Sequence, residues 1–160
     1  MRLIPTLWGY KVKIFLGSDH QGFHLKEAIF AWLSKEGYDV EDVGDKAPDP
    51  NDDYPQFAQM AAIKVLGSEA DDTRAILICG GGQGIAMAAN RFKGIRAAVV
   101  WDEYEAKMTR LDNESNVLSL PARVLDGDMN NVKNIVTTWL DTKFTGAARH
   151  VRRNQELDDF

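Results

Sequence analysis

The chain has 160 residues, of which 44% are hydrophobic and 27% are charged. This composition is typical of one soluble globular domain, and it excludes disordered, collagen-like and membrane-protein classes. The 19 basic and 24 acidic residues give a net charge of −5, which disfavours broad electrostatic binding of nucleic acid or anionic lipid. An anionic partner is therefore expected to be small and bound by a few local cations.

The only cysteine is Cys79, which excludes an intrachain disulfide and a cysteine-rich zinc site. Cys79 is interpreted either as a buried small side chain or as a reactive thiol. The sequence has no run of about 18 apolar residues and its start lacks a signal-peptide pattern, so we expect a cytoplasmic protein. Residues 1–10 fit neither a helix nor a strand. They are interpreted as an adapter, a start-site artefact or a dimer arm, without a function.

Short apolar runs alternate along the chain with segments of helical period. Strands are predicted, in chain order, at residues 12–17, 38–43, 74–79, 95–100 and 116–120. This alternation is typical of a parallel sheet with crossover helices. No repeat or linker divides the chain, so residues 1–160 are interpreted as one domain. The predicted fold is a three-layer αβα sandwich with a five-stranded parallel sheet, of the Rossmann or flavodoxin-like kind.

Helices are predicted between these strands. Leu25, Ile29 and Leu33 belong to one buried helical face that ends near Gly37. Further helices are expected at 54–66, from the glycine run to Phe92, at 102–111, around 132–140, and at 147–157. The last of these has too few apolar positions for a strong core face. It is expected at the surface or on a partner.

Ligands of parallel α/β sheets bind outside the carboxyl ends of the strands, so residues directly after each strand are the first candidates. Asp19 and His20 follow the first strand. They form either a ligand-binding pair, or a helix cap beside a histidine that packs or faces solvent.

A glycine loop follows the third strand and Cys79. Its glycines are Gly80, Gly81, Gly82 and Gly84. Without side chains in the way, backbone N–H groups at this helix start can converge on an oxyanion or a phosphate, and they favour a thiolate at Cys79. The loop matches neither the Walker nor the dinucleotide motif, so it predicts an oxyanion hole for a small carbonyl substrate rather than a nucleotide site.

Two later segments add polar candidates. Asp112, Asn113 and Asn116 lie between the fourth helix and the fifth strand and are expected near the same sheet edge; as an alternative they simply end the helix. Arg123 follows the fifth strand. Arg149 and Arg153, four residues apart, share one helical face and can clamp a phosphate, unless this is only a solvated charged terminus.

From 13 to 157 the chain resembles the ribose-5-phosphate isomerase B and galactose-6-phosphate isomerase family. The resemblance rests on five motifs in the right order: Asp19-His20-x-Gly22, Asp53-Tyr54-Pro55, ILICGGGQGIAMAANR at 76–91, Asn113 with Asn116, and Arg149-His150-x-x-Arg153. It implies an aldose–ketose isomerase of a phosphorylated sugar that needs no metal or organic cofactor. It also implies a homodimer or dimer of dimers with sites between subunits.

The resemblance also implies roles for individual residues. Cys79 would be the general base, and the N–H groups of the glycine loop would hold the enediolate oxygen with help from Asn113. Asp19 would contact sugar hydroxyls and Tyr54 would line the substrate site. The phosphate would be bound by His20, Arg123, Arg149 and Arg153, with the last two serving the partner's site.

Two positions depart from the family pattern. Gly81 replaces the usual threonine, and Asp112 replaces the histidine credited with opening the sugar ring, so that the Asp112 carboxylate would act as the base on the anomeric hydroxyl. Ile85 stands where some members have a glutamate base, which leaves Cys79 as the candidate base. Ribose 5-phosphate is the expected substrate. The alternatives are galactose 6-phosphate, a tetrose phosphate that is already open-chain, or a non-catalytic sugar-phosphate-binding paralogue. A signalling module of the same architecture is disfavoured, because the expected acidic magnesium cluster is missing.

Overall fold

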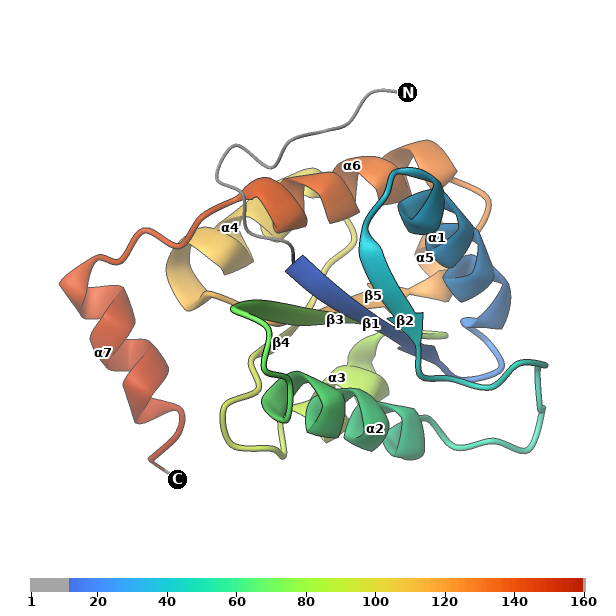
Figure 1. Cartoon of the computed structure of the whole chain (residues 1–160), viewed down its shortest axis with the longest axis horizontal. Helices are drawn as coiled ribbons and strands as arrows, with labels where there is room; N and C mark the ends of the chain where they lie inside the picture. Colours follow the sequence, from blue (N-terminus) through green and yellow to red (C-terminus); the bar gives the residue numbers. More distant parts are fainter. Residues whose placement is uncertain (1–11, 160) are drawn as a thin grey trace.

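The computed structural model describes residues 12–159 and contains one five-stranded sheet flanked by helices (Figure 1). The strands are β1 (Val12–Ser18), β2 (Asp39–Asp42), β3 (Asp72–Cys79), β4 (Ala97–Val99) and β5 (Val117–Pro121). The helices are α1 (Phe23–Lys35), α2 (Tyr54–Leu66), α3 (Gln83–Ala89), α4 (Glu103–Asn113), α5 (Ala122–Leu125), α6 (Met129–Asp141) and α7 (Ala148–Glu156). The segment 1–10 lies outside the described residues.

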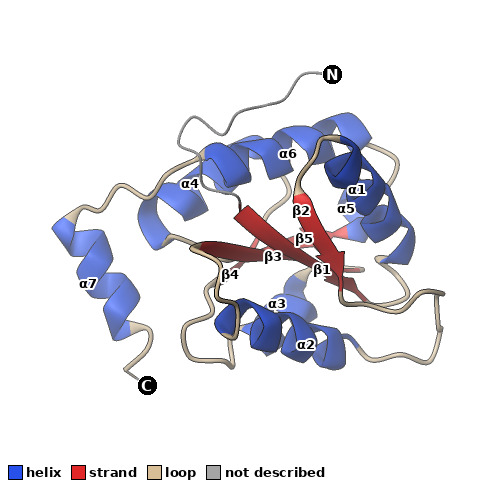
Figure 2. Cartoon of the chain, viewed as in Figure 1, coloured by secondary structure: helices blue, strands red, loops and turns tan. Residues whose placement is uncertain are grey.

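All strand pairs are parallel, in the order β2-β1-β3-β5-β4, which confirms the predicted sheet. Helices α2 and α3 cover one face, and α1, α4 and α6 cover the other, while α7 stands apart at one side (Figure 2). Because β3 is the central strand, with β1 and β5 beside it, the loops after these three strands meet at one edge of the sheet.

The strands divide the core into two layers by simple alternation. Ile14 and Leu16 of β1 pack on the side of α1 and α6, whereas Phe15 between them packs on the side of α2 and α3. Along β3 the same alternation sends Leu77 and Cys79 to the α2/α3 side. Cys79 thus ends a strand that is buried on both faces, which gives its side chain a fixed position.

The predicted strands agree with the observed ones to within two residues at each end, and α2 has the predicted bounds. The third helix is shorter than predicted, because it ends at Ala89 with Asn90 as its C-cap, and Phe92 lies in the turn that follows. The single-turn helix α5, which begins directly after β5, was not predicted. Within residues 12–159, no helix is both long and apolar enough to cross a membrane.

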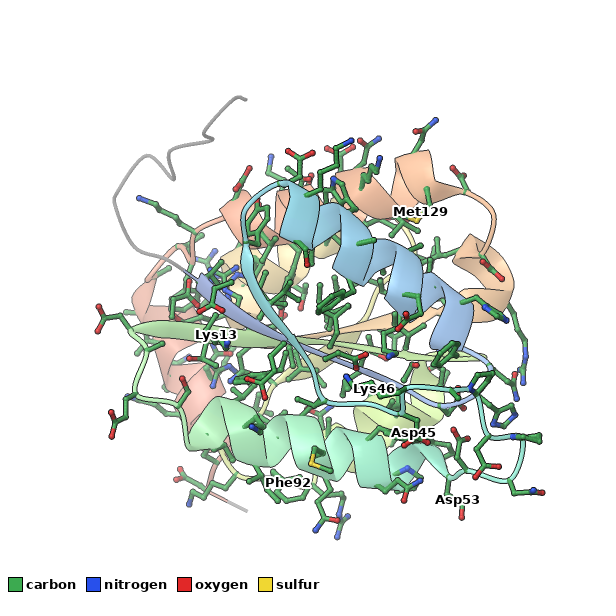
Figure 3. The ribbon with its side chains drawn as sticks, turned by 45° about the vertical axis from the view of Figure 1, so that its right-hand side comes forward. Lys13, Asp45, Lys46, Asp53, Phe92 and Met129 are labelled. Atoms are coloured by element: carbon green, nitrogen blue, oxygen red, sulfur yellow. The ribbon has the colours of Figure 1, made fainter. Side chains whose placement is uncertain are left out.

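A buried ion pair fixes the start of the loop between β2 and α2. Lys26 of α1 has no exposed surface, and its Nζ donates to the Asp42 carboxylate at the end of β2 and to the Asp45 carbonyl oxygen at 3.2 Å. Figure 3 shows Asp45 and Asp53 along this loop, which runs past the carboxyl ends of the strands to α2. Lys26 therefore anchors a segment that borders the candidate site.

We expect Lys26→Met to lower the free energy of unfolding by about 3 kcal/mol, because it leaves the Asp42 carboxylate buried without its main partner. The matched control is Lys46→Met. Lys46 lies 3.6 Å from the same carboxylate, but its side chain is 79% exposed, so its removal should cost less than about 1 kcal/mol. Urea unfolding of both variants measures the difference. Equal losses would contradict the buried role of Lys26, and Lys26→Met/Asp42→Leu should recover most of the stability.

Candidate active site

Cys79 lies at the end of β3, where the glycine loop begins. Cys79 is 5% exposed, and the Gly82 N–H donates to its Sγ at 3.2 Å. Gly82 has a left-handed φ of +70°, which favours glycine, and its carbonyl oxygen accepts a 2.6 Å hydrogen bond from Ser119 Oγ on β5. The thiol is therefore largely buried, and a main-chain N–H donor is aimed at its sulfur.

The glycine loop is covered at its two ends and bare between them. A Cβ at Gly80 would overlap Gln21 and the Arg123 guanidinium, and a Cβ at Gly84 would come within 2.6 Å of the Tyr54 ring. At Gly81 the nearest atom to such a Cβ is Arg123 Nη1, at 3.9 Å. Among residues 12–159 the Gly81 N–H meets no hydrogen-bond acceptor. A free backbone donor thus lies two residues beyond the sulfur.

The loop after β1 lies beside the glycine loop. The Asp19 N–H donates to the Ile78 carbonyl oxygen at 3.3 Å, and Gly22 packs so closely on that carbonyl that a Cβ would come within 2.6 Å of it. The N–H groups of Gln21 and Gly22 both donate to Asp19 Oδ1, which leaves Oδ2 available to a ligand. Burial raises the pKa of the Asp19 carboxyl, and these two hydrogen bonds oppose that effect.

His20 is held by a residue that the sequence did not single out, Asp52. Asp52 Oδ1 lies 2.6 Å from His20 Nδ1 and accepts the His20 backbone N–H at 3.1 Å, while the Asp52 side chain is only 3% exposed. The Asp52 hydrogen bond raises the pKa of His20, with smaller contributions from the charges of Asp19 and Asp49. The imidazole is 30% exposed and so can act as an oriented cation at this edge.

Arg123 completes the cations of this edge. It belongs to α5, its backbone N–H donates to the Gly80 carbonyl oxygen at 3.0 Å, and its guanidinium lies over the start of the glycine loop. The structure therefore brings together seven predicted positions and the loop between them. They are Asp19, His20, Tyr54, Cys79, Gly80, Gly84 and Arg123.

A second group of predicted residues lies at the opposite edge of the sheet. Asp112 and Asn113 end α4, just before β5 begins, and Cys79 pairs with Pro121 at the other end of β5. The length of β5 from Val117 to Pro121 corresponds to about 13 Å at roughly 3.3 Å per residue. The expectation that Asp112, Asn113 and Asn116 lie at the same sheet edge as the strand-end loops is therefore wrong, because a helix that leads into a parallel strand ends at the amino ends of the strands.

The side chains of this second group have different environments. Asn116 is structural, since its amide bonds the backbone of Gly94 and Arg96 and so joins β4 to β5. Asp112 Oδ1 lies 3.5 Å from His150 Nε2 on α7, and the Thr145 N–H donates to the Leu111 carbonyl oxygen at 3.2 Å. These contacts fix α7 against the end of α4.

Helix α7 presents two different faces. His150 and Asn154 are buried, whereas Arg149 and Arg153, each one residue earlier, are exposed. Among residues 12–159 neither guanidinium group has an ion-pair or hydrogen-bond partner. The predicted shared face is present, and its guanidinium groups are free to bind an anion. Within the same residues, no cluster of three or more His, Cys, Asp or Glu side chains could hold a metal ion.

Comparison with known proteins identifies the family. The family model described as Ribose/Galactose Isomerase matches residues 14–157. Ribose-5-phosphate isomerase B of Escherichia coli is 43% identical over 145 residues, which cover 91% of this chain and 93% of that protein. D-erythrulose-4-phosphate isomerase 2 of Mycolicibacterium smegmatis is 41% identical over 135 residues, which cover 83% and 86% of the two chains.

The fold comparison agrees. The crystal structure of ribose-5-phosphate isomerase B from Mycoplasma genitalium with bound ribulose-5-phosphate has a TM-score of 0.86 and 39% identity, and the match covers 94% of this chain and 96% of that one. The enzyme from Thermotoga maritima also has a TM-score of 0.86, with 40% identity and coverage of 93% and 99%. The flavodoxin-like sheet, the two strand-end loops and these matches together show that this chain belongs to the ribose/galactose isomerase family and is an isomerase.

Proposed function

We propose that this isomerase interconverts ribose 5-phosphate and ribulose 5-phosphate through an enediolate, with Cys79 as the general base. The Cys79 thiolate takes the proton from C2 of the open-chain aldose, so that a C1–C2 double bond forms and the carbonyl electrons move to O1. The O2 proton then moves to O1, the thiol returns its proton to C1, and the ketone is left at C2. The observation that best supports this is the Cys79 sulfur with the Gly82 N–H aimed at it and the free Gly81 N–H beside it.

The oxyanion of the enediolate requires donors that are already in place. In this chain they are backbone N–H groups, since Gly81 offers no hydroxyl. Fixed main-chain dipoles need no reorganisation when charge develops, which makes them effective stabilisers of an enediolate oxygen. Asp19 Oδ2 is placed to accept a hydrogen bond from a sugar hydroxyl.

We further propose that the complete site forms between two copies of the chain. His20 and Arg123 would bind the phosphate from the carboxyl edge of one copy, the edge of the sheet at which the strands end. Asn113, Arg149 and Arg153 would come from the amino edge of the other, at which the strands begin. The support is geometric, because the two groups lie at opposite edges of one sheet and, within residues 12–159, the guanidinium groups of Arg149 and Arg153 have no partner in their own chain. A homodimer related by a two-fold axis would form two equal sites.

The test of the reaction uses ribose 5-phosphate in deuterated, metal-free buffer. We expect ribulose 5-phosphate to form with deuterium at C1, because the abstracted proton exchanges with solvent before it returns. Binding without turnover of any sugar phosphate would instead indicate a non-catalytic sugar-phosphate-binding protein and would refute the proposal.

A four-carbon substrate is the second candidate, and the pairing of Asp112 with His150 favours it. A carboxylate that lies 3.5 Å from a histidine of its own chain is less free to open a sugar ring. An aldotetrose that carries its phosphate on O4 cannot close a five-membered ring, so it needs no ring-opening group. The relative from M. smegmatis is named for D-erythrulose 4-phosphate, a four-carbon ketose phosphate. A kcat/KM for erythrose 4-phosphate that exceeds those for ribose 5-phosphate and galactose 6-phosphate would establish this alternative.

The His20–Asp52 pair gives a pH prediction. The hydrogen bond to Asp52 raises the pKa of His20, so the imidazolium persists to higher pH, and phosphate affinity is lost as the pH rises through that raised pKa. We expect Asp52→Asn to keep the imidazole in place but to remove the carboxylate charge that raises the pKa of His20. At pH 7.5 the KM should rise roughly three- to tenfold with kcat nearly unchanged, and the increase of KM with pH should begin at lower pH.

The control for this variant is Asp49→Asn, from the same loop. Asp49 acts on His20 only through space, as the smallest of the charge contributions to its pKa, and its Oδ1 accepts the backbone N–H of Asn51. Its KM profile should follow that of the wild type. Identical pH profiles for Asp52→Asn and the wild type would contradict a role of Asp52 in phosphate binding.

A further inference from the structure

Gln21 is not among the residues that carry the family resemblance, yet it contacts the candidate site directly. Its Oε1 accepts hydrogen bonds from Arg123 Nε at 3.2 Å and from Arg123 Nη2 at 2.8 Å. The two residues are 102 positions apart in the sequence, on the loop after β1 and on α5 after β5. We call this contact the Gln21–Arg123 bridge.

The bridge lies directly over the glycine loop. A Cβ at Gly80 would overlap Gln21 Oε1 and would come within 2.8 Å of Arg123 Nη2. The Gln21 N–H is itself fixed by Asp19 Oδ1 at 3.0 Å, and the Arg123 N–H is fixed by the Gly80 carbonyl oxygen. Both ends of the bridge are therefore tied by their backbones to the loops that surround Cys79.

The bridge also determines which part of the guanidinium is left for a ligand. Gln21 occupies the edge formed by Nε and Nη2. The other amino group, Nη1, is the atom nearest to the open space at Gly81. A neutral carboxamide achieves this without neutralising the charge, whereas a carboxylate at the same place would compete with an anionic substrate.

We propose that Gln21 is a positioning residue of the active site, which holds the Arg123 guanidinium over the glycine loop so that its free edge binds the anionic group of the substrate. An exposed arginine side chain loses rotamer freedom when it binds a ligand, and a hydrogen bond that holds it in advance removes part of that cost. The inference rests on the proposed function only for the identity of the substrate, because the anion itself can be tested as inorganic phosphate.

The experiment is a double-mutant cycle with Gln21→Ala, Arg123→Ala and the double variant, read out as the Kd for inorganic phosphate and as KM and kcat with ribose 5-phosphate. Gln21→Ala should weaken phosphate binding and raise KM by about three- to tenfold, with kcat within about twofold of the wild type. In the Arg123→Ala background the same substitution should have no further effect. Gln21→Glu should weaken phosphate binding more than Gln21→Ala does, because the introduced carboxylate would occupy the guanidinium as an ion pair.

The control is Gln59→Ala, the same substitution on the exposed surface of α2, which should leave all three constants unchanged. The bridge is solvent-exposed, so none of the variants should change the unfolding midpoint appreciably. Additive effects of Gln21→Ala and Arg123→Ala would overturn the proposal, as would a Gln21→Glu variant that binds phosphate as well as the wild type. If the wild type binds phosphate but isomerises no sugar, the proposed function fails. The Kd values for inorganic phosphate then still decide the role of Gln21.

Discussion

Cys79→Ala is expected to lower kcat by at least about a hundredfold, the effect of losing a general base, while the fold persists. The change removes a single sulfur atom at the end of β3, and the Gly82 N–H that pointed at it can donate to a water in its place. Ile85, where the family resemblance would place an alternative glutamate base, has no group that could take up the proton. Steady-state kinetics with ribose 5-phosphate and a thermal unfolding curve provide the measurement.

Ser18→Ala is the matched control for this prediction. Ser18 ends the neighbouring strand β1, is 2% exposed, and has an Oγ without a hydrogen-bond partner among the described residues, so this substitution also removes one buried heteroatom at a strand end. It should leave kcat within about twofold of the wild type. If Cys79→Ala turns over as fast as this control, the thiol is only a buried small side chain, which is the alternative that the sequence left open.

The sequence was sufficient for the sheet because apolar runs and helical periods alternate regularly along the chain. Runs such as RAILIC at 74–79 have no polar residue in their centre, which predicts a strand buried on both faces. Helix α5 was missed because its four residues, Ala122 to Leu125, are too few to establish a period. The end of α3 was misplaced because Phe92 continues the apolar pattern after the helix has stopped at Asn90.

The carboxyl-edge residues were predictable from position alone, since Cys79 ends one strand and Asp19, His20 and Arg123 closely follow the two strands beside it. Asp52 and Gln21 were not. Asp52 lies in a loop with several other acidic residues, and nothing in their spacing indicates which one folds back onto His20. Gln21 contacts Arg123 across most of the chain length, and such a pairing depends on the strand order, which the sequence pattern does not define.

The separation of the two residue groups follows from strand direction. A helix that precedes a parallel strand ends at the amino edge of the sheet, so the end of α4 lies opposite the end of β3 whatever residues it contains. Asp112 and Asn113 can reach a substrate at Cys79 only if another copy of the chain supplies them. The same holds for α7, which is fixed to the end of α4 through Leu111 and Asp112.

Two inactive variants should therefore restore activity when they are refolded together. We expect Cys79→Ala to be inactive because its carboxyl edge lacks the base. We expect Arg149→Ala/Arg153→Ala to lose most of its kcat/KM because its amino edge lacks the two arginines. A mixed dimer has one site with both defects and one site in which the intact carboxyl edge of one chain meets the intact amino edge of the other. Random pairing makes about half of the dimers mixed, so about a quarter of the wild-type kcat/KM should return.

The control is a mixture of Cys79→Ala with His20→Ala, two variants of the same edge. Each site of their mixed dimer contains one defective carboxyl edge, so no site is intact and the activity should stay at the mean of the two separate variants. Recovery in the first mixture and not in the second requires that the two edges belong to different chains, because a site made within one chain would stay defective in both. Failure of the first mixture to recover, with mixed dimers verified by mass spectrometry, would refute the shared site and would require α7 to reach Cys79 of its own chain.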